Sequence, residues 1–152
     1  MSPIGPERAT SVTAADDVLR DVFGKGWVVR VQSPLALGEQ SDPQPDIAVV
    51  AGSRRDYRKA HPTTAVLIVE VADTTVDYDG KVKASLYAKA DIPDYWLLNI
   101  GAHRLEVYRD PQPDPTKPYG FGYATALNLK AGESIAPLAK PGAKSLVNDL
   151  LP

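Results

Sequence analysis

Hydrophobic positions along the chain form six short runs, each rich in Val, Ile, Leu or aromatic residues. Such runs are typical of β-strands, because branched and aromatic side chains pack well on a pleated surface. The strands are expected at 27–32, 46–50, 65–72, 94–100, 104–109 and 119–129. The run at 65–72 is almost wholly apolar, which predicts a strand buried on both faces.

Two other segments place apolar residues at helical spacing. One helix is expected over roughly 13–23, after an irregular start at 1–10, and the other over roughly 78–90. The ridge of the second helix that is expected to pack on the sheet consists of Val82, Leu86 and Ala90. The order helix, three strands, helix, three strands predicts one α/β (α+β) domain over residues 1–152, with a mixed β-sheet flanked by helices.

Composition narrows the class of protein. The 152 residues are 43% hydrophobic and include no cysteine, so the chain can bury an ordinary core but has no disulfide or thiolate site. No apolar run approaches about 18 residues, and the start MSPIGPERAT does not match a signal peptide. A cytoplasmic protein without a membrane span is therefore expected. Fourteen prolines cluster in segments such as 111–118, which is expected to be a loop.

Basic residues gather between two of the expected strands. They are Arg54, Arg55, Arg58 and Lys59. This basic cluster could grip nucleic-acid phosphates, but a solvated loop explains it equally well, because Asp56 dilutes its charge. The net charge of the chain is −2, which disfavours a protein that coats nucleic acid, whereas a nucleic-acid enzyme needs only a local basic patch.

Glu70 is a carboxylate within the apolar run at 65–72. Because side chains alternate along a strand, Glu70 shares a face with Ile68 and Ala72. An unpaired carboxylate on a buried face is costly or takes up a proton, so a metal ion, a cation or hydrogen bonds must compensate it. A purely structural pairing with lysine would meet that need as well as a metal site would.

Asp46 lies at the entry to the preceding strand, so it can meet Glu70 if the two strands are neighbours. Two hard oxygen ligands close together suit Mg²⁺. On the following helix Lys83 borders the side expected to be buried and can point back toward Glu70. Asp79 and Tyr87 lie on the same ridge, four residues before and after it. Two carboxylates and a lysine are a set that can hydrolyse phosphodiesters, in which a metal activates water and the lysine stabilises charge.

Six stretches carry a family resemblance. They are MSPIGP (1–6), VVRVQSPLAL (28–37), PQPDIAVV (43–50), HPTTAVLIVEVADTTVDYDGKVKASLYAKADIPDYW (61–96), RLEVYRDP (104–111) and ESIAPLAKPG (133–142). The combination of PD, EV, D-x-x-x-K-x-x-x-Y and YW resembles the bacterial Uma-type family of putative restriction endonucleases, part of the PD-(D/E)XK nuclease superfamily. The resemblance implies a restriction-endonuclease-like core and cleavage of DNA that depends on Mg²⁺ or Mn²⁺.

The resemblance also assigns site residues. Asp46 matches the PD position, Glu70 matches the acid on the next strand, and the backbone carbonyl of Val71 would be a further metal ligand. The superfamily's usual lysine, two residues after the acid, would fall at Ala72 and is absent. The lysine that matches this family lies on the following helix and is Lys83.

Some positions support or depart from the family pattern. Asp79 matches a typical acid that would cap the helix or hold Lys83, and Tyr87 is expected in the core beside the site. Most relatives begin earlier, with a helix and hairpin that this chain is expected to lack. Arg8 stands where relatives often have His, and Asp91 replaces a glycine at a left-handed position after the helix.

Three hypotheses remain open. The first is an endonuclease dependent on Mg²⁺ or Mn²⁺, with Asp46, Glu70 and Lys83 as its catalytic residues. The second is a catalytically inactive nuclease-fold module that serves binding or accessory roles. The third is a hydrolase of another phosphoester. Strands 104–108 and 119–127 could also pair two chains, so a homodimer is expected with the first hypothesis.

Overall fold

The computed structural model describes residues 4–38, 42–73 and 77–152, apart from the side chains of 77–79. The helices are α1 (Pro6–Phe23) and α2 (Asp77–Lys89), with 3-10 turns η1 (Arg54–Tyr57) and η2 (Val147–Leu150). The strands are β1 (Trp27–Val31), β2 (Ile47–Ala51), β3 (Leu67–Ala72), β4 (Asp94–Asn99), β5 (Arg104–Pro113), β6 (Phe121–Lys130), β7 (Ser134–Ile135) and β8 (Ser145–Leu146). Among the described residues, no helix is long and apolar enough to cross a bilayer.

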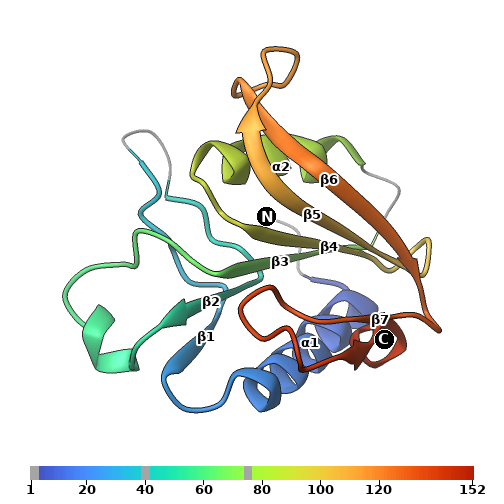
Figure 1. Ribbon diagram of the computed structural model, residues 1–152. Helices are drawn as coiled ribbons and strands as arrows, with labels where there is room; N and C mark the ends of the chain where they lie inside the picture. Colours follow the sequence, from blue (N-terminus) through green and yellow to red (C-terminus); the bar gives the residue numbers. More distant parts are fainter. Residues whose placement is uncertain (1–3, 39–41, 74–76) are drawn as a thin grey trace.

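Six strands form one sheet in the order β1-β2-β3-β4-β5-β6 (Figure 1). All neighbours are antiparallel except β3 and β4, which are parallel. Helix α2 makes the crossover between them, because a parallel pair cannot be joined by a tight turn. The sheet is therefore mixed and flanked by α1 and α2, as the order of elements predicted.

The two faces of the sheet bury separate cores, and β3 contributes alternate residues to each. Val69 and Val71 pack with the buried residues of α1, whereas Ile68 packs with the buried residues of α2. Glu70 lies on the same face as Ile68, since its carboxylate contacts Tyr87 of α2. The alternation along β3 thus directs this acid toward α2, as expected.

Helix α1 begins at Pro6, which corrects the expectation of an irregular segment over 1–10. Gly5 precedes the helix in an extended conformation, and a proline at the first helical position loses no intrahelical hydrogen bond. Pro6 thus marks a helix start where the sequence was interpreted as irregular. As a result Arg8 belongs to the first turn of α1.

The face that α2 presents to the sheet differs from the expected ridge. Ala90 packs against the core on this side of the sheet, as predicted, whereas Val82 and Leu86 are only half-buried and lie outside that core in the described part of the chain. Among the residues of α2 whose burial is described, the buried positions are Gly80, Ala84, Ser85, Tyr87 and Ala88. Small residues are needed because the helix lies close to the sheet: a Cβ on Gly80 would be 2.6 Å from a methyl carbon of Leu97. The buried face therefore combines a small residue at Gly80, where the helix closely approaches the sheet, with the large ring of Tyr87.

Strand β5 continues to Pro113, although 111–118 was expected to be a loop. Beyond the pair of Asp94 with Arg109, β5 has only β6 as a neighbour, with Pro111 opposite Tyr123. A proline that lacks an N–H is tolerated there, because that edge of the strand has no partner to receive a hydrogen bond. The result is a two-stranded arm that extends past the rest of the sheet (Figure 1).

Candidate active site

Asp46 and Glu70 meet where the start of β2 lies beside the end of β3. The two strands are antiparallel, with Ile47 opposite Val69, so Asp46 comes to the level of Glu70. The backbone amide of Asp46 donates a hydrogen bond of 3.1 Å to Glu70 Oε1. Only 3% of Asp46 and 5% of Glu70 are exposed. The strands are neighbours, which is the condition under which the two acids were expected to meet, and both acids lie at one edge of the core.

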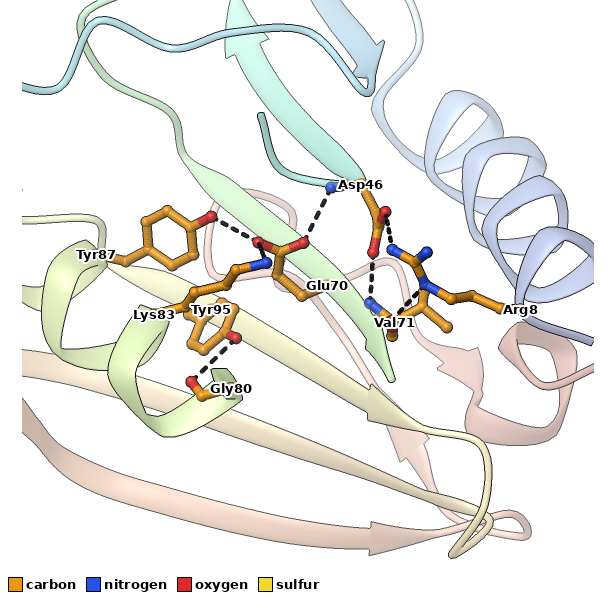
Figure 2. Close-up of polar contacts among 8 residues, drawn as sticks. All are labelled: Arg8, Asp46, Glu70, Val71, Gly80, Lys83, Tyr87 and Tyr95. Carbon is orange, nitrogen blue, oxygen red and sulfur yellow. Dashed lines mark hydrogen bonds and ion pairs between the residues drawn. The ribbon is translucent and has the colours of Figure 1, made fainter. Parts of the chain in front are cut away.

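Helix α2 supplies two donors to the other oxygen of Glu70 (Figure 2). The Tyr87 hydroxyl donates a hydrogen bond of 2.6 Å to Glu70 Oε2, and Lys83 Nζ lies 3.3 Å from the same atom. Tyr87 is completely buried, whereas 37% of the Lys83 side chain is exposed. Lys83 therefore pairs with the acid and still reaches solvent, where a substrate would approach.

Burial and charge act on the Glu70 carboxyl in opposite directions. Burial raises the pKa of Glu70 above its usual value, and the neighbouring Lys83 ammonium is the largest effect that lowers this pKa. Burial and the proximity of Glu70 together raise the pKa of the Tyr87 hydroxyl, so that it remains a hydrogen-bond donor. Removing the Lys83 charge would make the ionised form of Glu70 harder to keep.

A layer of tyrosine rings holds Tyr87 in place. The rings of Tyr87 and Tyr95 meet edge to face, with centroids 5.1 Å apart, and Tyr95 stacks in turn on Tyr108 at 5.7 Å. The Tyr95 hydroxyl donates a long hydrogen bond of 3.4 Å to the carbonyl of Gly80 in α2. This packing fixes α2, and therefore Lys83 and Tyr87, against the strand that carries Glu70.

The Asp46 carboxylate is held from the other side. Its Oδ2 accepts a hydrogen bond of 2.8 Å from the Val71 amide, and its Oδ1 accepts one of 2.7 Å from Arg8 Nη2. Arg8 Nε donates a further bond of 2.9 Å to the Val71 carbonyl oxygen. Figure 2 shows the guanidinium of α1 lying across both acceptors. In the sequence Arg8 stands out only as a departure from the family pattern, so its contacts with Asp46 and Val71 were not predicted.

The candidate ligand atoms at this site are oxygens, which is the atom type that hard divalent cations such as Mg²⁺ prefer. Candidate ligands are the carboxylates of Asp46 and Glu70 and the carbonyl oxygen of Val71. All three residues already contact a cationic side chain, since the Arg8 guanidinium binds Asp46 and Val71 together and Lys83 lies beside Glu70. A positive group is therefore accommodated here. Within the described ranges, no group of three or more His, Cys, Asp or Glu side chains forms a metal cluster, so a metal would also need the backbone carbonyl and water.

Other predicted residues lie apart from this site or outside the described part of the chain. The side chain of Asp79, expected to support Lys83, is among those that the structure does not describe. The exposed residues of the basic cluster follow the far end of β2, at the opposite end of that strand from Asp46; they are Arg54, Arg55, Arg58 and Lys59. Any phosphate that they bind would therefore be distant from Glu70.

Comparison with known proteins gives one family and one fold. A family model described as "Uma2: Putative restriction endonuclease" matches residues 1–137. The chain is also similar to a solved structure titled "Crystal structure of a putative nuclease belonging to DUF820 from Anabaena variabilis ATCC 29413 at 1.96 A resolution". The TM-score is 0.71 with 13% identity, over 99% of this chain and 82% of that one, which shows a shared fold. No curated protein matches the chain.

Proposed function

We propose, from the premise that this chain belongs to the Uma2 family of putative restriction endonucleases, that it is a Mg²⁺-dependent endonuclease acting on DNA phosphodiester bonds. One observation carries the proposal. The backbone amide of Asp46 donates a hydrogen bond of 3.1 Å to the Glu70 carboxylate, which places the two acidic residues side by side, and Lys83 Nζ lies 3.3 Å from the same carboxylate. Two acids and a partly exposed lysine are the side chains that metal-assisted phosphodiester hydrolysis requires.

The residues that would hold Mg²⁺ or Mn²⁺ are Asp46, Glu70 and, through its carbonyl oxygen, Val71. When bound, the ion would polarise a phosphoryl oxygen and lower the pKa of a coordinated water. The Val71 amide orients the Asp46 carboxylate by a 2.8 Å bond, and Tyr87 orients that of Glu70 by a 2.6 Å bond. Both acids would therefore be presented in fixed directions before substrate binds.

Lys83 would act on the reacting phosphate. Its ammonium group sits between the Glu70 carboxylate and solvent, where it can stabilise negative charge on the phosphoryl group or orient the attacking water. Ala72, two residues after Glu70, cannot take this part because it has no polar side chain. Helix α2 would therefore supply the catalytic lysine, since Lys83 reaches the Glu70 carboxylate from the face of the sheet that α2 covers.

DNA is the proposed partner, and the basic cluster at 54–59 is a proposed backbone contact. All four of its cations are exposed, which supports phosphate binding. Since the cluster follows the opposite end of β2 from Asp46, it would hold a part of the duplex away from the cleaved bond. A role in affinity is therefore proposed for these residues, and none in the chemical step.

Cleavage of supercoiled plasmid tests the proposal. Wild type, Glu70→Ala, Lys83→Ala and the exposed control Lys144→Ala would be assayed with Mg²⁺ or Mn²⁺ and again with a chelator. Wild type and Lys144→Ala should cleave with metal only, and the other two variants should lose at least about 100-fold of the rate. Equal traces of cleavage in all four proteins would identify a contaminant and contradict the proposal.

A non-catalytic nuclease-fold module is the second candidate function. It is favoured by the contacts of the acids, because both oxygens of Asp46 and both of Glu70 already bind groups of the protein. Calorimetry with Mn²⁺ separates the two candidates. Absence of both cleavage and divalent-ion binding would support the module.

A homodimer and a single domain over 1–152 remain part of the proposal. Strand β6 is an edge of the sheet and carries Leu127, which is exposed, so it offers a surface on which two chains could pair. Sedimentation analysis at several protein concentrations would detect the dimer. A monomer at all concentrations would contradict that part alone.

A further inference from the structure

Arg8 binds two atoms that belong to different elements. Its Nη2 donates to Asp46 Oδ1 at 2.7 Å, and its Nε donates to the Val71 carbonyl oxygen at 2.9 Å. Asp46 precedes β2 and Val71 lies within β3, so the planar guanidinium joins the two strands from α1. These are the same two residues that are proposed to coordinate the divalent ion.

A divalent ion and this guanidinium would compete for the same two oxygen atoms. Mg²⁺ requires oxygen ligands at about 2.0–2.1 Å in near-octahedral geometry and keeps several waters. The nitrogen atoms of Arg8 occupy the approach to both oxygens at hydrogen-bond distance. Two cations at one position beside the buried Asp46 carboxylate would also repel each other.

The two cations in the site differ in which acid they engage. Lys83 lies beside Glu70 Oε2, on the α2 side, whereas Arg8 lies beside Asp46, on the α1 side. Only Arg8 contacts the Val71 carbonyl in Figure 2. Removal of Arg8 would therefore free two candidate ligand atoms, but removal of Lys83 would free neither.

The Arg8 guanidinium is exposed enough to move away from Asp46 and Val71 into solvent. The side chain of Arg8 is 30% exposed, compared with 5% for that of Asp46. It extends from the first turn of α1, and its flexible stem allows the head to swing into solvent without moving the helix. Asp46 would still be oriented by the Val71 amide after such a movement.

We propose that Arg8 is a built-in competitor of the divalent ion, which holds the site in a metal-free state until its guanidinium is displaced. The inference rests on the proposed function, because it uses the same metal ligands. Metal and guanidinium each weaken the binding of the other by the same factor, since the two states are thermodynamically linked. Wild-type protein is therefore expected to bind divalent ions weakly.

Calorimetric titration with Mn²⁺ tests the competition without any measurement of cleavage. Arg8→Ala and Arg8→Gln should each bind Mn²⁺ at least about 10-fold more tightly than wild type. The control Lys144→Ala removes the same charge from an exposed position and should bind as wild type does. Adding Asp46→Asn to Arg8→Ala should abolish the gain. Equal or weaker binding by folded Arg8 variants, or no binding by any protein, would overturn the inference.

A second measurement uses the unaltered protein. The Arg8 Nε–H signal in a nitrogen-15 NMR spectrum should move toward the position of a solvent-exposed arginine as Mg²⁺ is added. An unchanged signal at saturating Mg²⁺ would overturn the inference, whether or not the Arg8 variants fold. Tight Mn²⁺ binding by Arg8→Ala without plasmid cleavage would uphold the competition while contradicting the proposed nuclease. Cleavage by wild type, without any gain in Mn²⁺ affinity for Arg8→Ala, would support the proposed nuclease and contradict the competition.

Discussion

The amide of Asp46 donates a 3.1 Å hydrogen bond to the carboxylate of Glu70, and both residues are buried. This bond ties the entry of β2 to the end of β3, so the two acids are fixed relative to each other by the sheet itself. Groups from both faces then complete the site, with Tyr87 and Lys83 from α2 and Arg8 from α1. Stability and candidate activity are therefore coupled in this small region.

Tyr87→Phe should lower stability because it removes a buried donor from a charged acceptor. The free energy of unfolding is expected to fall by about 1.5–3 kcal/mol, the range for hydrogen bonds to charged groups. Urea denaturation measures the loss. Tyr119→Phe is the matched control, since Tyr119 is exposed, and it should be neutral. An equal change in both variants would mean that the Tyr87 hydroxyl contributes nothing specific.

Gly80→Ala should destabilise the packing of α2 on the sheet. The new methyl group would be 2.6 Å from Leu97 Cδ2, so the helix or the leucine must shift, at a cost of about 1–3 kcal/mol. Thermal unfolding of Gly80→Ala, Leu97→Ala and the double variant would show that the two costs are less than additive. Gly142→Ala, where no atom lies within 4 Å, serves as control. Full additivity would argue against the clash.

Asp91→Gly should stabilise the protein. Asp91 follows the end of α2 with φ of 60°, the left-handed region in which a side chain is strained and glycine is not. The gain is expected to be about 1 kcal/mol in the free energy of unfolding. Asp91→Ala should change stability in the opposite direction, because alanine tolerates this conformation less well than aspartate. Chemical denaturation of both variants measures these changes. A lower free energy of unfolding for Asp91→Gly would contradict the prediction.

Ionised Asp114 should stabilise the loop between β5 and β6, so this stabilisation should depend on pH. Hydrogen bonds from the Thr116 hydroxyl and amide, at 2.6 and 3.0 Å, lower the pKa of Asp114. A lowered pKa in the folded state means that the stabilisation is present above the unfolded pKa and is lost as the pH falls through the folded one. Thr116→Val should move the pKa of Asp114 back up, measured by carboxyl carbon NMR titration. If the pKa of Asp114 is unchanged in Thr116→Val, the Thr116 hydroxyl is not the cause of the lowered pKa.

The sequence alone determined the order of the main elements and the face of the third strand that carries Glu70. Runs of branched residues identified the strands, and the alternation along 65–72 put Glu70 on the face opposite Val69 and Val71. Local periodicity carries this information. The meeting of Asp46 with Glu70 was expected only if their strands were neighbours, and the observed antiparallel pairing of β2 with β3 meets that condition.

Lys83 and Tyr87 were expected beside Glu70, but only the tertiary structure decided that Arg8 joins the site and which face of α2 is buried. The close approach of α2 to Leu97 requires a small residue at Gly80, a position that hydrophobicity alone would not place on the buried face. The place of Arg8 depends on where α1 starts and on the reach of a long side chain across two strands. The basic cluster lies far from Asp46 because β2 separates them along its length. Each of these depends on distances between elements, which the pattern of residues along one chain does not record.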